Sequence, residues 1–308
     1  MPHERCDVSV IIPAYRAEAT IERALSSIAA QTVLPREIIV VDDGSDDETV
    51  KRTESRIGKM NGAELIVLRQ DHRGPGAARN LALKKAVGTY VAFLDADDEW
   101  LPEKLERSLE VMRKTGSVLV SHNFESIDGS KSVTVDCTKR FKAGEDSFKN
   151  YFLFGFIATS TVVTRRDILI KSGGFDPGLL SGQDYELWLI VADNNIHNIH
   201  VFPDVLTRYH ISKLGITSNI ELRRRCALRI LNRHSGHLRN HPGSPMLTTA
   251  SRALIIHGQA AQAYVSKRHF GRALLSCLKA FPNTLQAMLG LMKTTQGRPN
   301  YLDFKTTT

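Results

Sequence analysis

Long apolar runs are absent from this sequence of 308 residues. No segment reaches the roughly 18 consecutive apolar residues of a membrane-spanning helix, and the apolar stretch at residues 285–292 is far shorter. Charged Glu4, Arg5 and Asp7 stand near the N-terminus, where a signal peptide has its apolar segment. The sequence therefore predicts no membrane span and no export signal, and we expect a cytoplasmic protein.

Cysteine is scarce and widely spaced. The four cysteines form neither a Cys-x-x-Cys pair nor the cysteine and histidine spacing of a zinc site: Cys6, Cys137, Cys226 and Cys277. We therefore expect free thiols, not a disulfide framework.

Two glycine-rich nucleotide motifs are also missing. The first apolar segment, residues 8–12, is followed by Pro13, Ala14 and Tyr15, where a dinucleotide fold has Gly-x-Gly-x-x-Gly. No Gly-x-x-x-x-Gly-Lys-[Ser/Thr] motif occurs either. These absences disfavour an NAD-linked dehydrogenase and a P-loop ATPase.

The composition that is present is that of a globular protein, with 42% hydrophobic and 24% charged residues. The formal net charge of +8 suits an acidic partner, which can be a nucleotide diphosphate, an anionic membrane face or nucleic acid. Nucleic acid is disfavoured, because no aromatic platform or base-reading motif accompanies the basic C-terminal segment.

Apolar segments alternate with helical patterns through the first hundred residues. Four continuously apolar segments are typical of strands covered on both faces: residues 8–12, 38–41, 65–68 and 90–94. Helical spacing separates them, with Thr20 as an N-cap candidate and Pro75 opening another helix. The pattern predicts an α/β fold with a doubly wound, mainly parallel sheet and helices on both faces.

Later segments are less regular. We expect strands at residues 118–122 and 160–164, a loop or weak hairpin at 128–147, and a helix at 184–191 that turns Leu187, Trp188 and Val191 inward.

A domain boundary is expected near residue 220, which divides the chain into a catalytic domain at 1–220 and a helical C-terminal region at 221–308. Residues 250–281 resemble one tetratricopeptide-type helical hairpin that ends at Pro282, with packing positions at Tyr264, Phe270, Ala273, Leu274 and Ala280. A single unit is not an array. The arginines at 223–225 suit a solvated helix face or contact with an anionic membrane.

Acidic residues follow the second and fourth predicted strands. Ligands bind outside the carboxyl ends of the strands in an open parallel sheet, so these residues should share one edge. Clustered carboxylates repel one another unless a cation or hydrogen-bond donors compensate their charge. Mn²⁺ or Mg²⁺ suits them, since both ions prefer oxygen ligands and often bind one or two carboxylates together with phosphate oxygens. The five residues are Asp42, Asp43, Asp95, Asp97 and Asp98.

Four ordered segments carry a resemblance to a known family: residues 8–15, 39–45, 74–80 and 92–98. Together they look like the inverting family-two glycosyltransferases of the GT-A fold, over roughly residues 7–215. The resemblance implies a nucleotide-sugar donor, with UDP-sugar expected, and a saccharide or lipid-linked saccharide acceptor in cell-surface polysaccharide or glycoconjugate synthesis.

The resemblance also implies site residues. Pro13 and Tyr15 would line the uridine pocket, Asp43 would bind the uracil edge, Arg79 would approach the base or diphosphate, and Asp95 would contact the ribose. The donor site would also include Ala14, Asp42, Ala96 and His210. Asp97, with Asp98, would hold the metal.

On the acceptor side, Asp184 matches the position of the family's catalytic base, and His210 and Lys213 lie in the segment that closes over the diphosphate. Two departures stand out: Gln183 replaces the usual Glu, and His210 stands where Arg is usual.

Each residue has a simpler structural interpretation, as a turn former, a helix cap or a surface charge. Two other functions stay open at this point: a catalytically inactive nucleotide-sugar-binding protein, and a transferase that uses polyprenyl phosphate as acceptor.

Overall fold

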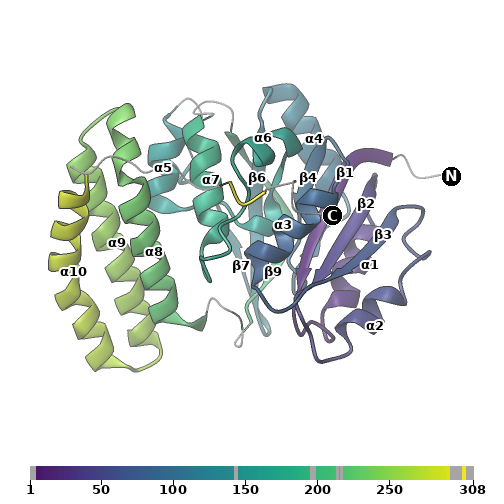
Figure 1. Cartoon of the computed structure of the whole chain (residues 1–308), viewed down its shortest axis with the longest axis horizontal. Helices are drawn as coiled ribbons and strands as arrows, with labels where there is room; N and C mark the ends of the chain where they lie inside the picture. Colours follow the sequence, from purple (N-terminus) through teal and green to yellow (C-terminus); the bar gives the residue numbers. More distant parts are fainter. Residues whose placement is uncertain are drawn as a thin grey trace.

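The computed structural model describes residues 5–141, 145–194, 199–212, 215, 218–291 and 300–302. One nine-stranded sheet runs through the molecule in the order β3-β2-β1-β4-β8-β6-β9-β5, and β7 pairs with β6 beside this path. Three C-terminal helices stand side by side at one end of the molecule, on the left in Figure 1. The predicted α/β class is confirmed.

The N-terminal half has the predicted alternation of strands and helices. Strands β1 to β4 pair in parallel, with β1 between β2 and β4. The four strands contain or closely overlap the four apolar segments found in the sequence. The elements in chain order are β1 (Arg5–Ala14), α1 (Ile21–Ala29), β2 (Leu34–Asp42), α2 (Thr49–Glu54), β3 (Glu64–Arg69), α3 (Pro75–Lys85) and β4 (Tyr90–Phe93).

The second half of the sheet is mixed. Strand β8 lies antiparallel between β4 and β6, whereas β6 and β9 pair in parallel. Of the loop or weak hairpin expected at 128–147, β7 forms and pairs back on β6, which lies before this range, and the predicted inward helix is α7. The elements are β5 (Glu99–Trp100), α4 (Lys104–Thr115), β6 (Leu119–Asp128), β7 (Lys131–Val135), α5 (Ser147–Phe154), the 3₁₀ turn η1 (Thr159–Thr161), β8 (Val163–Arg165), α6 (Arg166–Lys171), α7 (Gln183–Asn194) and β9 (Ile199–His210).

Alternating side chains of the central strands feed two separate cores. Ile11 of β1 packs with Ala78 of α3 and Trp188 of α7, whereas the neighbouring Ile12 packs with Leu25 of α1. Successive side chains of a strand point to opposite faces, so a strand that is covered on both sides must be apolar throughout. This explains the continuous apolar segments in the sequence.

The C-terminal part consists of α8 (Ile220–His234), the 3₁₀ turn η3 (Ser235–Asn240), α9 (Pro245–Ser266) and α10 (Phe270–Gly290). Ile230 and Ala287 belong to the same core cluster as Trp188, so apolar packing continues across residue 220. The division into 1–220 and 221–308 stays a prediction about folding units.

Four local expectations were wrong. Residues 160–164 form the end of η1 and then β8, not one strand, because Ser160 and Thr161 turn their hydroxyls to buried polar partners. Thr20 precedes α1, but its side chain makes no capping hydrogen bond. Helix α10 continues through Pro282 to Gly290, where packing against α9 offsets the missing amide donor. Phe270 and Leu274 are exposed, at 65% and 63%, and are not packing positions.

Candidate active site

The acidic turn comprises Asp95, Ala96, Asp97 and Asp98, and it connects β4 to β5 at the carboxyl end of β4. A turn hydrogen bond from Asp98 N to Asp95 O, 3.0 Å long, folds the segment back on itself. Arg23 of α1 donates to the Asp97 carbonyl oxygen from the other side. The short β5 then pairs with the end of β9, which brings the turn beside His210. The backbone thus holds three carboxylates close together.

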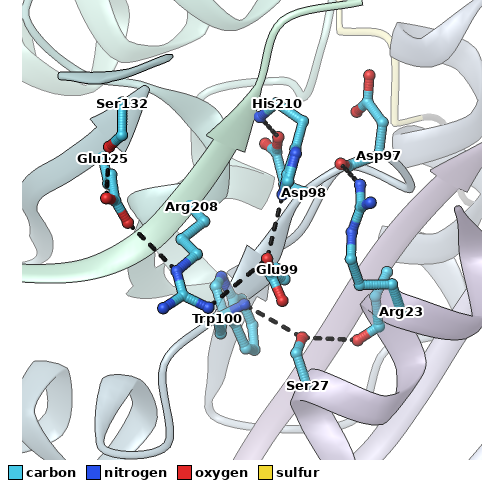
Figure 2. A network of polar contacts seen from close by, with 11 residues as sticks. Arg23, Ser27, Asp97, Asp98, Glu99, Trp100, Glu125, Ser132, Arg208 and His210 are labelled. Atoms are coloured by element: carbon cyan, nitrogen blue, oxygen red, sulfur yellow. Dashed lines mark hydrogen bonds and ion pairs between the residues drawn. The ribbon is translucent and has the colours of Figure 1, made fainter. Parts of the chain in front are cut away.

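Asp97 has the most available carboxylate of the turn. Within the described residues, its side chain is bonded only by its own backbone N–H, and in Figure 2 it points away from Arg23. Burial, followed by the negative charge of Asp95, raises the pKa of Asp97 to about 6. A divalent cation would offset both effects, so the donor chemistry here fits Mn²⁺ or Mg²⁺.

The described residues include no group of three or more His, Cys, Asp and Glu side chains arranged to hold a metal ion. A bound ion would therefore need further ligands from water or from a substrate. Mg²⁺ and Mn²⁺ sites of this kind usually combine one or two carboxylates with phosphate oxygens.

Asp98 is fully buried and already paired. Its two oxygens accept hydrogen bonds from the Ser160 hydroxyl at 2.5 Å and the His210 backbone N–H at 2.9 Å. Burial and the neighbouring Asp95 and Asp97 raise its pKa well above the usual range. The His210 ring instead meets Glu99, with 3.1 Å between Nε2 and Oε1 (Figure 2). Asp98 thereby ties β9 to the acidic turn.

The turn η1 connects this acidic turn to Asp184. The Ser160 hydroxyl also accepts from the Asp95 backbone N–H at 3.1 Å, and the adjacent Thr159 hydroxyl donates to Asp184 Oδ2 at 2.7 Å. Neither residue was predicted from the sequence: Ser160 was assigned to the strand expected at 160–164, and Thr159 lies just before it. The signal available in the sequence was the unbroken run of hydroxyl side chains at 159–161.

Asp184 lies in the first turn of α7, where its other oxygen accepts from the Tyr185 backbone N–H at 2.8 Å. Two residues further along, the buried Glu186 pairs with Arg233 at 2.5 Å and His234 at 3.1 Å, and these contacts fix α7 against α8. Asp184 is therefore held on a rigid support.

Gln183, at the residue before Asp184, is buried and packs against α3. A Cβ added at Gly76 would lie 3.3 Å from Gln183 Cγ, so the close approach of the two helix starts requires a glycine there. The Gln183 Oε1 atom is buried without a hydrogen-bond partner among the described residues.

Arg79 is buried in α3 and forms an ion pair with Asp95, at 2.5 Å between Nη2 and Oδ1. Its guanidinium also stacks over the Phe175 ring at 5.4 Å. The side chain of Arg79 is only 4% exposed, whereas that of Asp95 is 30% exposed. The buried guanidinium of Arg79 thus orients the partly exposed carboxylate of Asp95.

Asp43 organises the loop between β3 and α3. One oxygen accepts from Gln70 Nε2 at 2.6 Å and from Arg73 N at 2.9 Å, and the other accepts from Gly74 N at 2.8 Å. His72, on the same loop, lies 2.9 Å from Asp43 and stacks on Tyr15, with the ring centroids 4.1 Å apart.

Tyr15 and His72 form an exposed aromatic pair, with Tyr15 42% exposed and the His72 side chain 57% exposed. Such a surface suits the face of a nucleobase. His72 was missed in the sequence, although it follows β3 at the edge where ligands bind in open sheets.

The remaining candidates of the donor side are buried in the sheet edge. Pro13 and Ala14 end β1, and the Ala14 carbonyl accepts from Asp43 N at 2.8 Å. Asp42 is 1% exposed and accepts from Ser45 N at 3.2 Å, and Ala96 is 7% exposed. These residues shape the floor of the site. Lys213 lies outside the described residues.

The order of the strands and the helices that cover them give the chain a GT-A fold. Residues 9–173 match the family described as glycosyl transferase family 2, and the chain belongs to this family.

One relative is an Escherichia coli protein named UDP-Glc:alpha-D-GlcNAc-diphosphoundecaprenol beta-1,3-glucosyltransferase WfgD. It is 34% identical over 215 residues, which cover 69% of this chain and 80% of WfgD.

Two solved structures share the fold. Staphylococcus aureus TarS 1–349 in complex with UDP-GlcNAc superposes with a TM-score of 0.71 at 23% identity, over 91% of this chain and 81% of TarS. The mannosyltransferase PcManGT from Pyrobaculum calidifontis, in complex with GDP-Man and Mn²⁺, gives a TM-score of 0.62 at 20% identity, over 94% and 80% of the two chains.

Proposed function

We propose that this glycosyltransferase moves a sugar from a UDP-sugar to a hydroxyl group of a lipid-linked saccharide, with inversion at the anomeric carbon. The observation that carries the proposal is the hydrogen-bonded connection from the acidic turn through Ser160 and Thr159 to Asp184. This connection supports a candidate base, held by hydrogen bonds, close to the turn that carries a candidate metal ligand with a free carboxylate among the described residues.

The donor side uses the edge of the parallel strands. The base would stack on Tyr15 and His72, and Asp43 would shape its pocket through the loop at residues 70–74. Asp95, held by Arg79, would face the ribose. TarS, which shares the fold, binds UDP-GlcNAc, and this supports a uridine nucleotide here.

Asp97 would hold Mn²⁺ or Mg²⁺, together with oxygens of the donor diphosphate. When bound, the ion supplies positive charge that stabilises the departing diphosphate. Asp98 would act indirectly, since its hydrogen bonds to Ser160 and His210 set the shape of the turn that carries Asp97.

Asp184 would act as the general base. Its carboxylate takes the proton of the acceptor hydroxyl, and the oxygen forms a bond to the anomeric carbon. The bond from that carbon to the diphosphate oxygen breaks, and its electron pair leaves with the nucleoside diphosphate. A base positioned in this way typically accelerates a reaction by about 10² to 10⁴-fold. The Thr159 hydroxyl holds the carboxylate in place.

A lipid-linked acceptor is supported by the name of WfgD, which acts on a sugar attached to diphosphoundecaprenol. It implies synthesis of a cell-surface polysaccharide or glycoconjugate. No described helix is long and apolar enough to cross a membrane, so we propose that the chain reaches such an acceptor by lying on the bilayer surface.

The surface of α10 supports contact with an anionic bilayer. An apolar stripe of α10 recurs at helical spacing, and its members are between 49% and 78% exposed: Phe270, Leu274, Leu278, Phe281, Leu285 and Leu289. The sequence has no Asp or Glu from residue 222 to residue 302, so arginines and lysines set the charge of this region. Apolar side chains beside uncompensated positive charge suit an interface with anionic lipids.

The experiment that tests the function is a donor screen. The purified chain is incubated with a panel of nucleotide sugars in Mn²⁺ or Mg²⁺, and release of nucleoside diphosphate is measured with and without a lipid-linked GlcNAc acceptor. We expect UDP release from one UDP-sugar, stimulated by the acceptor and abolished by EDTA. Tight UDP binding without turnover on any donor and acceptor pair would instead indicate a binding protein.

A further inference from the structure

A basic cavity lies beside the start of α7. It has a volume of about 160 Å³ and is enclosed by the start of α7 and by α8 and α9. A single water molecule needs only about 10 to 15 Å³ of such volume, so the cavity has room for a larger group. We call it the arginine cavity because Arg223, Arg224 and Arg252 line it.

Every charged side chain that lines the arginine cavity is basic. None of the residues that line it is acidic. Glu221, the nearest acid on α8, is shared between Arg224 at 2.7 Å and Arg225 at 3.0 Å. These two ion pairs lower the pKa of Glu221 to about 2, so it stays ionised and compensates only part of the positive charge.

The arginines are held in position before any ligand binds. Arg252 is 7% exposed, donates to the Leu153 carbonyl at 2.9 Å and stacks over the Tyr185 ring at 4.9 Å. Arg224 is 8% exposed and is fixed by Glu221. Guanidinium groups of fixed orientation recognise phosphate oxygens well, because their N–H groups match the oxygens in pairs.

The position of the cavity connects it with the reaction. Ser181, Gly182 and Tyr185 line its wall, and Asp184 lies between them in the chain. The N-terminus of α7 therefore faces this region and adds its own positive field. Apolar Ile220, Ile230 and Ile256 complete the lining.

We propose that the arginine cavity binds the phosphate oxygens that link the acceptor sugar to its lipid. The sugar hydroxyl would lie at Asp184 while the diphosphate attached to the same sugar lies against Arg223, Arg224 and Arg252. The inference rests on the proposed function, since it gives a chemical identity to the group beside the acceptor sugar. The proposal explains why Asp184, at the start of α7, lies next to a cluster of arginine side chains.

The first test measures binding of inorganic pyrophosphate to the full chain by calorimetry. EDTA is present so that metal-dependent binding at the acidic turn is removed. We expect Arg252→Gln and Arg223→Gln each to weaken pyrophosphate binding at least tenfold. Arg225→Gln is the matched control, because Arg225 is on the same helix, 73% exposed, and does not line the cavity. Its affinity should stay within twofold of the unmodified chain.

The second test separates an acceptor phosphate from a free one. Transfer is measured to two acceptors that differ only in their anomeric group, GlcNAc diphosphate on an alkyl lipid and plain alkyl GlcNAc. Arg223→Gln should raise KM for the diphosphate acceptor about tenfold and leave KM for the alkyl glycoside unchanged. Because Arg223 is exposed, we expect Arg223→Gln to fold. The test of the cavity therefore remains decisive even if Arg252→Gln unfolds.

Absence of pyrophosphate binding, or equal binding by all four proteins, overturns the inference. Weaker pyrophosphate binding with an unchanged acceptor KM overturns the assignment to the acceptor. UDP release from a donor, measured on the same preparations, reports on the proposed function independently. Turnover without pyrophosphate binding sinks only the cavity proposal, and pyrophosphate binding without any donor turnover sinks the transferase proposal.

Discussion

At the scale of single residues, Asp184 and Asp97 have different surroundings. We therefore expect substitutions at the two positions to have different effects on the reaction. Asp184 is tied by Thr159 and by the start of α7, whereas the carboxylate of Asp97 meets no other residue of the described chain. A base is positioned by its neighbours, and a metal ligand must remain accessible. The two carboxylates are thus distinguished by their hydrogen bonds more than by their sequence motifs.

Asp184→Asn should lower kcat by about 10² to 10⁴-fold and leave UDP affinity unchanged. The amide keeps the size of the side chain and can still accept from Thr159, but it takes no proton from the acceptor. Turnover with a UDP-sugar and direct UDP titration measure the two effects. An Asp184→Asn enzyme with full turnover would show that Asp184 does not take the proton of the acceptor hydroxyl.

Asp97→Asn should weaken UDP binding in the presence of Mn²⁺ at least tenfold and have little effect on UDP binding in EDTA. The metal-free variant should unfold at the same or a higher temperature than the unmodified chain above pH 6. The raised pKa of Asp97 means that its ionisation costs stability as the pH rises through about 6, and asparagine removes that cost. Equal Mn²⁺ dependence in both proteins would contradict the assignment.

At the scale of elements, the turn η1 determines how the two halves of the site are joined. Thr159 and Ser160 are adjacent, yet they have different hydrogen-bond partners. The Thr159 hydroxyl donates to Asp184, whereas the Ser160 hydroxyl donates to Asp98 and accepts from the Asp95 backbone N–H. A 3₁₀ turn directs consecutive side chains about 120° apart, so neighbouring residues reach different partners. This geometry needs η1 in place of the strand predicted at 160–164.

Thr159→Val should lower kcat several-fold to tenfold and leave KM for the donor unchanged. Valine keeps the shape of the side chain but removes the hydroxyl that donates to Asp184. Thr159→Ser retains the hydroxyl and serves as the control, with kcat near that of the unmodified chain. A kcat of Thr159→Ser as low as that of Thr159→Val would contradict the positioning role of this hydroxyl.

The sequence predicts the strands that follow from a local pattern of apolar residues. It misses turns and contacts that depend on residues far away in the chain. Strands β1 to β4 follow from continuous apolar segments, because each is covered on both faces. The turn η1 depends on Asp98 and Asp184, which are far away in the chain, so no local pattern identifies it. The stacking of His72 on Tyr15 is likewise set by a loop that Asp43 folds.

The ion pair between η3 and α7 gives a pH-dependent contribution to stability. A hydrogen bond to Asp193, 2.7 Å long, raises the pKa of His237. The stabilisation is therefore fully present below about pH 6.5, the unperturbed pKa of histidine, and is lost as the pH rises through the raised value. His237→Gln should lower the unfolding temperature more at pH 6 than at pH 9. The exposed His269→Gln is the control, and an equal loss at both pH values would contradict the prediction.

At the scale of the whole molecule, the C-terminal helices connect the site to a surface. Helix α8 fixes α7 through Arg233 and His234, α9 packs on α8, and α10 packs on α9 (Figure 1). The apolar stripe of α10 is exposed. An apolar stripe of this length is unusual on a surface that faces only water. The same three helices therefore support α7 on one side and expose an apolar stripe on the other.

The membrane contact predicts that the intact chain binds vesicles containing anionic lipid and not vesicles of neutral phosphatidylcholine alone. Binding arises from both the apolar stripe of α10 and the acid-free, basic sequence around it, so salt should weaken it without abolishing it. Replacing Leu278 and Phe281 with Gln should reduce vesicle binding at least tenfold in a sedimentation assay. Turnover with a water-soluble, short-chain acceptor should remain near that of the unmodified chain, since the stripe is remote from Asp184. If the same substitutions leave vesicle binding intact and instead convert a dimer to a monomer, the stripe covers a second copy of this chain and the membrane assignment is wrong.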